Sequence, residues 1–273
     1  MKLAFSTLGC PNWDLSTIIQ RAVEHGYNGV DFRGYLADVD LRKSPIFAPG
    51  EIRRTAGSIR DAGLAVCALS SGARMFDATP GARAESLDEM RAYAEMARET
   101  GAGIVRIFGG ALNGTPLEDA LAVAGETLCH ASEIAQQAGI VFAVETHDDW
   151  VATPPLARAF ERAGFPKSVE ILWDVHHPYR VAGETPETTC ANIGKLTRHT
   201  HWKDSVATAN GGHELCRFGH GDIPLKKIYD VLAAGGYDGW HTFEWEKRWV
   251  PGLPEPEVAY PDFTRVMRGF EKG

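Results

Sequence analysis

Short apolar runs alternate with longer stretches of helical periodicity along the whole chain. The amphipathic stretch 14–26, for example, has apolar residues at helical spacing between Asp14, a suitable N-cap, and Gly26, a suitable helix end. Runs with the length and composition of strands lie at residues 2–9, 29–32, 64–70, 104–110, 140–146, 169–175, 199–204 and 240–246. The pattern therefore predicts eight strands, each followed by a helical segment.

Repeated strand–helix units require crossover connections between parallel strands. In a chain of 273 residues, eight such units predict a closed (β/α)8 TIM barrel that forms a single domain over residues 1–273. A doubly wound open sheet is the main competitor, but the glycine-rich G-x-G-x-x-G turn expected after its first strand is missing. Residues 35–48 and 205–222 are interpreted as loops that could cover an active site.

Metal-competent side chains occur at the ends of the last four predicted strands. Glu145 and Asp174 end the fifth and sixth strands, and His201 and Glu244 lie in the seventh and eighth. Because the carboxyl ends of barrel strands converge on one rim, we expect these four side chains to meet. Three carboxylates and one imidazole suit Mn²⁺, Mg²⁺ or Co²⁺ and tolerate Zn²⁺. The sequence therefore predicts one divalent metal ion at this rim.

Each of these residues also has a structural interpretation. Glu145 and Asp174 could cap the helices that follow them, and His201 could be a hydrogen-bonded core residue. Glu246 shares the strand face of Glu244 and competes with it as a ligand. Four independent coincidences at the correct strand ends are less probable than one shared site. The metal site is therefore the preferred interpretation.

Three further residues are candidate substrate contacts. His147 lies on the same side of its strand as Glu145. Lys203 could stabilise an enediolate, although an ion pair with Asp204 is the simpler interpretation. Arg106 is flanked by apolar residues, and burying its charge unpaired would be costly. It must therefore either meet an acidic neighbour inside the barrel, which we favour slightly, or reach an anionic substrate.

Five motifs, taken in order, resemble those of the xylose isomerase-like TIM barrels, a family described as sugar phosphate isomerases and epimerases. They are VET at 144–146, WDVHHP at 173–178, HTHWKDS at 199–205, GHGDIPL at 219–225 and FEWE at 243–246. The resemblance covers essentially the whole chain. It implies one divalent metal held by Glu145, Asp174, His201 and Glu244. It also implies that His177, from a D-x-x-H motif, contacts substrate oxygen, and that a homo-oligomer is possible.

Chemistry at such a site would begin with loss of a carbon-bound proton from a hydroxyketone, giving an enediolate that a metal stabilises. With Glu145 and Glu244 on opposite sides, return of the proton to the other face gives epimerisation. Return at the neighbouring carbon gives isomerisation. Expulsion of a β-hydroxyl, with His177 as the acid, would instead give a dehydratase of a keto-inositol or related polyol. The leading hypothesis is an isomerase or epimerase of a small sugar or polyol.

Other function classes are disfavoured by charge and by missing residues. The net charge of −8 and the absence of a basic stretch argue against a nucleic-acid partner. The AP endonuclease branch of the superfamily needs extra histidines, but the corresponding places read ALSSG, IFGG and HWKDS. A non-catalytic sugar-binding barrel would be expected to have lost a ligand, whereas all four candidates are present.

The amino-terminal stretch and the cysteines indicate the compartment. MKLAFSTLGCPNW is too short and too broken by Gly9 and Pro11 for a signal peptide or a membrane span. The five cysteines are scattered without a C-x-x-C pair, which favours reduced thiols over a disulfide framework or a thiolate zinc site. We therefore expect a cytoplasmic protein without a membrane partner.

Overall fold

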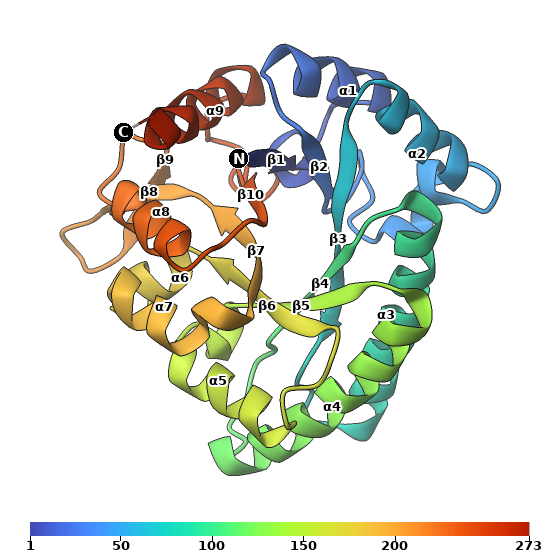
Figure 1. Ribbon diagram of the computed structural model, residues 1–273, viewed down its shortest axis with the longest axis vertical. Helices are drawn as coiled ribbons and strands as arrows, with labels where there is room; N and C mark the ends of the chain where they lie inside the picture. The colour runs from blue at the N-terminus through green and yellow to red at the C-terminus, as the bar shows by residue number, and fades with distance from the viewer. Residues whose placement is uncertain (273) are drawn as a thin grey trace.

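The computed structural model describes residues 1–272 and shows a closed ring of parallel strands surrounded by helices (Figure 1). Around the ring the strands follow the order β1-β10-β7-β6-β5-β4-β3-β2, and β2 closes the ring by pairing with β1. The barrel strands are β1 (Lys2–Ser6), β2 (Gly29–Phe32), β3 (Ala65–Arg74), β4 (Ile104–Phe108), β5 (Val141–Glu145), β6 (Val169–Asp174), β7 (Thr197–Trp202) and β10 (Trp240–Phe243). The predicted single-domain TIM barrel and all eight predicted strands are confirmed.

The helices lie outside the ring of strands. The first begins after Asp14, whose carboxylate accepts a hydrogen bond from the Thr17 N–H, as the sequence predicts for an N-cap. The α-helices are α1 (Leu15–Glu24), α2 (Ile52–Asp61), α3 (Pro80–Thr100), α4 (Leu117–Ala138), α5 (Thr153–Arg162), α6 (His176–Arg180), α7 (Pro186–Ile193), α8 (Leu225–Ala234) and α9 (Pro256–Lys272). Short 3-10 turns are η1 (Thr7–Gly9), η2 (Leu41–Lys43), η3 (Pro45–Phe47), η4 (Asp148–Trp150) and η5 (Gly194–Leu196). No helix within residues 1–272 is both long and apolar enough to cross a bilayer.

Two separate apolar clusters hold the fold together. The larger one includes residues of the helices and of the strand faces that they cover. The smaller one gathers side chains of five strands, and its members are mostly small: Ala4, Cys67, Ala68, Ile104, Ala143 and Leu172. The strand register places Ala4 beside Thr242, and Ala68 beside Asp31. Polar residues therefore share the interior face of the barrel with this small apolar layer.

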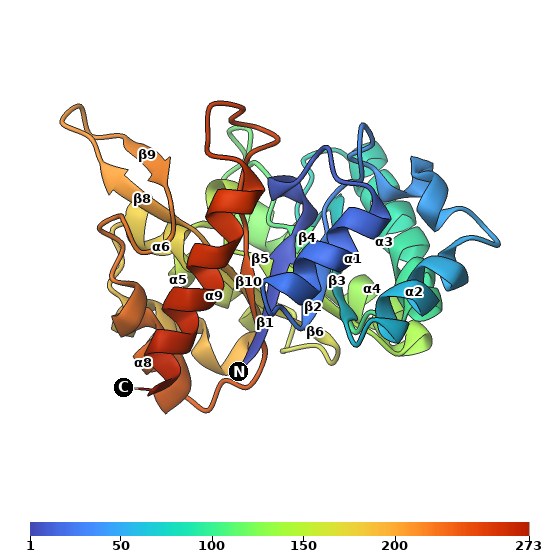
Figure 2. The ribbon, with the colours of Figure 1, turned by 90° about the horizontal axis from the view of Figure 1, so that it is seen from above.

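The structure corrects the sequence interpretation at two places. The last barrel strand ends at Phe243, so Glu244 follows the strand instead of lying within it. Residues 205–222, interpreted as a loop, contain most of an antiparallel hairpin of β8 (Asp204–Ala207) and β9 (His213–Cys216). The turn between these strands includes Gly211, whose φ of +82° suits glycine. Figure 2 shows the hairpin projecting from the body of the barrel.

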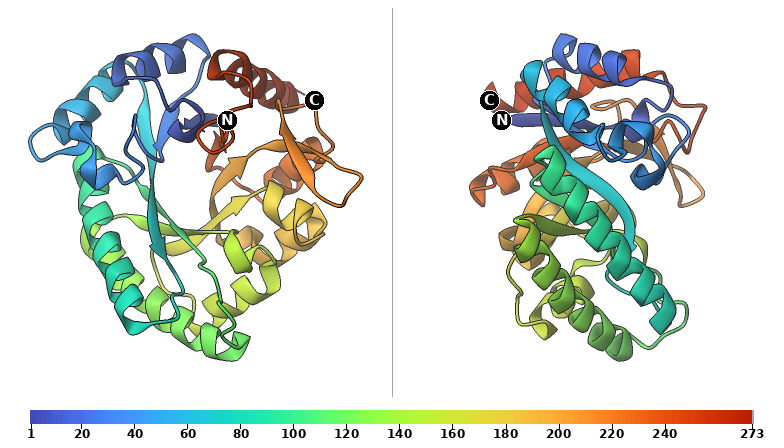
Figure 3. Two further views of the ribbon diagram at one scale, coloured as in Figure 1. Left: turned by 180° about the vertical axis from the view of Figure 1, so that it is seen from behind. Right: turned by 90° about the vertical axis from the view of Figure 1, so that its right-hand side faces the viewer.

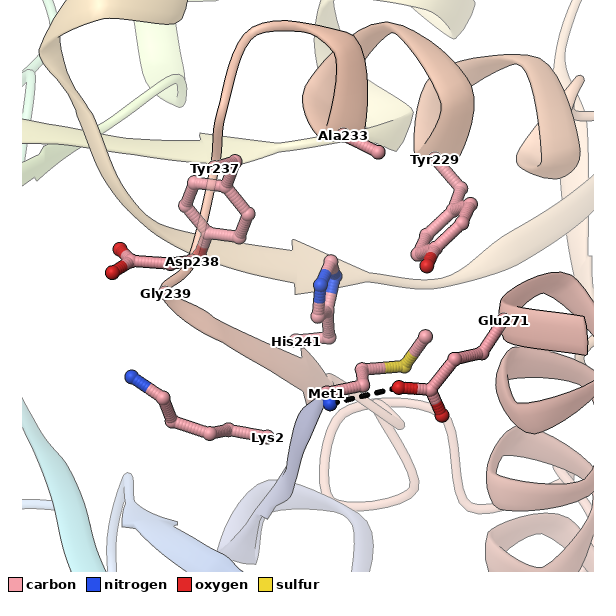
Figure 4. A pocket seen from close by; sticks show the side chains of 9 residues that line it. All are labelled: Met1, Lys2, Tyr229, Ala233, Tyr237, Asp238, Gly239, His241 and Glu271. Atoms are coloured by element: carbon pink, nitrogen blue, oxygen red, sulfur yellow. Dashed lines mark hydrogen bonds and ion pairs between the residues drawn. The ribbon is translucent and has the colours of Figure 1, made fainter.

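The amino-terminal ends of the barrel strands border a cavity of about 330 Å³ beside the start of β1 (Figure 4). The beginning of β1 and the end of α9 meet here (Figure 3), and the Met1 ammonium lies 2.9 Å from the Glu271 carboxylate. The His241 imidazole lies between Tyr229 and Tyr237, with ring centres 5.9 and 5.3 Å from its own. His241 is only 5% exposed, and its Nδ1 has no hydrogen-bond partner within residues 1–272.

This buried histidine should make the fold sensitive to acid. Burial lowers the pKa of His241 from 6.5 to about 4, so the unfolded chain binds a proton in this pH window that the folded protein does not. Stability is therefore lost as the pH falls from 6.5 towards 4. When the pH is lowered from 7 to 5, we expect the unfolding free energy of His241→Gln to fall by about 2 kcal/mol less than that of the wild type. Urea titrations at both pH values measure this difference, and equal losses would contradict it.

Candidate metal centre

The strand register places the four predicted ligands on the interior face of the barrel. Asp174 of β6 lies directly opposite His201 of β7. His201 in turn lies opposite Thr242 of β10, two residues before Glu244. Because side chains two residues apart share a strand face, this arrangement aims Glu244 inward. The same alternation applies to Glu145, which pairs with a residue two positions before Asp174.

The four side chains converge at the carboxyl end of the barrel. Glu145, Asp174, His201 and Glu244 each offer one ligand atom, and these atoms all lie within 4.8 Å of one another. The His201 Nδ1 lies 2.9 Å from Glu145 Oε1 and 3.2 Å from Glu244 Oε1. None of the four residues is more than 5% exposed. The structure thus brings together the residues that the sequence assigned to one site.

Asp174 combines a structural contact with a place in this cluster. Its Oδ1 accepts hydrogen bonds from the backbone N–H groups of His176 and His177, at 2.9 and 3.3 Å, where α6 begins. The helix-capping role considered from the sequence therefore applies to one of the two carboxylate oxygens of Asp174. Its Oδ2 is buried and lacks an aligned hydrogen bond within residues 1–272. That second oxygen lies 3.0 Å from the Lys203 ammonium.

Lys203 lies among the carboxylates, with its ammonium at the centre of three ion pairs. The Nζ is 3.0 Å from Asp174 Oδ2, 2.6 Å from Glu244 Oε2 and 2.6 Å from Glu246 Oε1. The ion pair with Asp204 considered from the sequence is wrong. Consecutive residues of an extended chain point to opposite sides, so Asp204 faces away from Lys203. Its carboxylate instead accepts hydrogen bonds from backbone N–H groups, including that of Gly219 at 2.9 Å.

The electrostatics of the cluster fit a divalent cation. Burial raises the pKa of the Glu244 carboxyl, but the Lys203 ammonium and the His201 imidazole outweigh this effect and hold the pKa well below its ordinary value. Burial alone would lower the pKa of the His201 imidazole. The surrounding Glu244 and Glu145 carboxylates outweigh this effect and raise the pKa well above its ordinary value. These two carboxylates thus hold positive charge on an imidazole whose Nδ1 lies between them. Hard oxygen ligands with one imidazole are the donor set of Mn²⁺, Mg²⁺, Co²⁺ or Zn²⁺.

A wall of partly exposed rings adjoins the cluster. The His147 ring centre lies 4.8 Å from that of Phe108 and 4.9 Å from that of His177. His177 Nδ1 lies 2.9 Å from the Thr146 carbonyl oxygen, which can only accept, so Nδ1 carries the proton. His177 Nε2 is the other nitrogen and lies 3.5 Å from Lys203 Nζ. His147 and His177 therefore stand beside the metal-competent cluster.

Arg106 lies inside the barrel and contacts an acidic neighbour. This is the first of the two alternatives considered from the sequence. Its side chain is 1% exposed, with Nε 3.3 Å from Glu145 Oε2. A second guanidinium nitrogen donates to the Ser71 carbonyl oxygen at 2.8 Å. Burial raises the pKa of Glu145, but Arg106 and His201 hold the net pKa below its ordinary value. Contact between Arg106 and a substrate stays a prediction.

Asp31 of β2 is a member of the site that the sequence analysis missed. Its buried Oδ2 lies 2.9 Å from His201 Nε2, the ring nitrogen that faces away from the cluster. Its Oδ1 accepts a hydrogen bond from Ser70 Oγ at 2.9 Å. A carboxylate in this position fixes the orientation of an imidazole ligand. The available signal was a carboxylate near the end of the second strand, 170 residues from its partner.

Comparisons with known proteins agree with this architecture. A family model described as "Xylose isomerase-like TIM barrel" matches residues 19–268. The Escherichia coli (strain K12) protein "Uncharacterized protein YihM" is 27% identical over 156 residues, which are 56% of this chain. That match spans only 45% of the length of YihM.

Solved structures share the fold over nearly the whole chain. The IolI protein with a bound zinc atom gives a TM-score of 0.80 at 16% identity, covering 99% of this chain and 96% of IolI. The probable 3-DHS dehydratase AsbF from Bacillus anthracis gives 0.79 at 14% identity, covering 98% and 99% of the two chains. An L-ribulose 3-epimerase gives 0.77 at 19% identity, covering 100% and 95%.

The family match spans most of the chain, and four of the five motifs that carry the sequence resemblance lie at the strand ends where the structure gathers the cluster. The solved structures add a shared fold along the full length. The chain therefore belongs to the xylose isomerase-like TIM barrel family.

Proposed function

We propose that this protein is a divalent-metal-dependent isomerase or epimerase of a sugar or polyol that presents a hydroxyketone. The observation that carries the proposal is the buried cluster in which Glu145, Asp174, His201 and Glu244 each offer one ligand atom, all within 4.8 Å of one another. Solved structures of the same fold include an L-ribulose 3-epimerase, and IolI binds a zinc atom, which supports an enzyme with a metal centre.

The four clustered residues would hold the metal ion. When bound, a divalent cation supplies Lewis-acid stabilisation of the negative charge that an enediolate develops on its two oxygens. Side chains of the protein add further fixed charges to the site. Lys203 adds a fixed positive charge beside Glu244, and Arg106 does the same beside Glu145.

The two glutamates are the candidate proton carriers. Glu145 Oε2 is buried without an aligned hydrogen bond within residues 1–272, whereas Glu244 Oε2 accepts one from Lys203 Nζ at 2.6 Å. Glu145 Oε2, which lies 3.3 Å from Arg106 Nε, is thus held less directly than Glu244 Oε2. A proton taken by one glutamate and returned by the other on the opposite face gives epimerisation. Return at the neighbouring carbon gives isomerisation.

A metal-dependent dehydratase of a keto-inositol or related polyol is the second candidate. His177 supports it, because its Nε2 lies near the Lys203 ammonium and could carry a proton to a departing hydroxyl. The fold shared with AsbF, described as a probable dehydratase, supports it as well. This reaction would create an unsaturated product with new ultraviolet absorbance, whereas an epimerase would leave the absorbance unchanged.

Solvent-deuterium exchange tests the proposed function directly. The protein is incubated in D₂O with a panel of ketoses, and deuterium at the carbon beside the carbonyl is followed by NMR. We expect exchange in protein loaded with Mn²⁺, loss of exchange after treatment with a chelator, and recovery when Mn²⁺ is restored. Exchange that persists unchanged in metal-free protein would contradict metal dependence. A panel in which no ketose exchanges and no unsaturated product forms would reject both candidates.

A further inference from the structure

Arg33 contributes a cationic side chain at the same end of the barrel as the metal-competent cluster. It directly follows β2, and its backbone N–H donates to Thr7 Oγ1 at 2.9 Å, which fixes the chain at this point. Its guanidinium carbon lies 5.8 Å from the centre of the Phe108 ring. The guanidinium carbon of Arg106 lies 3.7 Å from the same ring centre. Two guanidinium groups therefore adjoin one aromatic ring.

The two arginines differ in how their charges are compensated. Arg106 is buried and lies beside Glu145, whereas Arg33 has no carboxylate within ion-pair distance among residues 1–272. Within the part of the chain that the structure describes, the only side-chain hydrogen bond of Arg33 is a long one, 3.3 Å, to the Val39 carbonyl oxygen. Burial and the neighbouring Arg106 charge lower the pKa of Arg33 to about 10. Holding this guanidinium beside another cation costs free energy that the chain's own contacts do not offset.

A ligand could reach Arg33 and the cluster together. Arg33, Phe108, His147 and His177 are all partly exposed, and the three rings form a continuous wall with spacings of 4.8 and 4.9 Å. His177 lies at the cluster end of this wall, next to Lys203. The wall thus connects the uncompensated guanidinium with the proposed reaction centre.

The chemistry around Arg33 favours a carboxylate over a phosphate. A single planar guanidinium pairs with two oxygens of either a carboxylate or a phosphate, so the surrounding groups decide between them. Phosphate sites in barrels instead use several backbone N–H groups in the loops after the last strands. Here the N–H groups of Gly219 and Gly221 in that region already donate to Asp204 Oδ2, at 2.9 and 2.8 Å.

We propose that Arg33 binds a carboxylate at the end of the substrate opposite the reacting carbons, so that the substrate is a keto-sugar acid. The inference rests on the proposed function and narrows it from sugars in general to those with a terminal carboxylate. The competing interpretation is structural, with Arg33 only tethering the loop at Val39. Arg248 is a matched control, because its guanidinium donates to the Leu36 carbonyl oxygen of the same loop.

Three ligands that differ only at carbon 6 test the proposal: D-fructose, D-fructuronate and D-fructose 6-phosphate. Calorimetric titration into Mn²⁺-loaded protein measures each affinity, and the same titration into metal-free protein separates the anion site from metal chelation. We expect the wild type to bind D-fructuronate about 10- to 100-fold more tightly than D-fructose. Arg33→Gln should lose this preference and leave D-fructose binding unchanged. Arg33→Lys should retain part of it, and Arg248→Gln should retain all of it.

Three outcomes would overturn the inference. A carboxylate preference that survives in Arg33→Gln would place recognition elsewhere, and equal binding of D-fructuronate and D-fructose by the wild type would remove the preference itself. Tighter binding of D-fructose 6-phosphate than of D-fructuronate would replace the carboxylate by a phosphate. Loss of deuterium exchange with all ketoses would reject the proposed function, while the affinity ratio would still report on Arg33.

Discussion

Replacing Glu145 with glutamine is expected to slow deuterium exchange into a substrate ketose by about 10²- to 10⁴-fold, the usual contribution of a positioned general base. Glutamine keeps the shape of the side chain and removes its capacity to take a proton. Glu145 Oε1 lies at the cluster, and its Oε2 has no aligned hydrogen bond within residues 1–272. The exchange rate is measured by NMR in D₂O after Mn²⁺ loading of the variant has been verified.

Comparison with Glu244→Gln separates the two reaction types. If the two glutamates act on opposite faces, each variant should stop epimerisation and still exchange deuterium into one of the two epimers, a different one in each case. Glu246→Gln is the matched control, because Glu246 also contacts Lys203 at 2.6 Å but lies outside the cluster. It should keep most of the exchange rate. Undiminished exchange with both epimers in Glu145→Gln would reject Glu145 as the base.

The barrel and its four-residue cluster could be predicted because both follow from local patterns and one geometric rule. Alternating strand and helix periodicity fixes the order of elements, and parallel strands in a closed barrel place their carboxyl ends on a common rim. Glu145 and Asp174 stand at strand ends in the sequence itself, so the rule locates them directly. The rule needs no knowledge of side-chain contacts.

Contacts between distant side chains could not be predicted in this way. Asp31 contacts His201 across 170 residues of sequence, and the four-residue strand that carries it looks like any short buried run. Lys203 was assigned to its sequence neighbour Asp204, although an extended chain points adjacent side chains apart. Its true partners include Glu246, which lies 43 residues away. Such pairings depend on the register of the closed barrel.

The missed hairpin has a different cause. Its strands, β8 and β9, contain four residues each, and alternate positions are not clearly apolar because much of the hairpin is exposed. The Asn210-Gly211 pair in the turn is a strong local hairpin signal, and it outweighs the weak strand pattern. Turn chemistry was therefore more informative here than hydrophobic periodicity.

Lys203→Met should destabilise the metal-free protein by about 3–5 kcal/mol, the usual cost of removing one partner from a buried ion pair. The Lys203 side chain is 2% exposed, and its ammonium contacts the carboxylates of Asp174, Glu244 and Glu246. Methionine fills similar space without charge, so these carboxylates would stay buried and uncompensated. Urea unfolding in the presence of a chelator measures the loss, and Lys203→Arg should recover part of it because it restores the charge.

Metal should then rescue the methionine variant more than it stabilises the wild type. A divalent cation that binds only the folded state raises stability according to its concentration and affinity. Its charge also compensates the carboxylates that Lys203 no longer neutralises. Lys226→Met is the matched control, since Lys226 forms an exposed pair with Asp230 at 2.6 Å and should cost less than about 1 kcal/mol. A Lys203→Met variant as stable as the wild type without metal would show that the carboxylates do not depend on this ammonium.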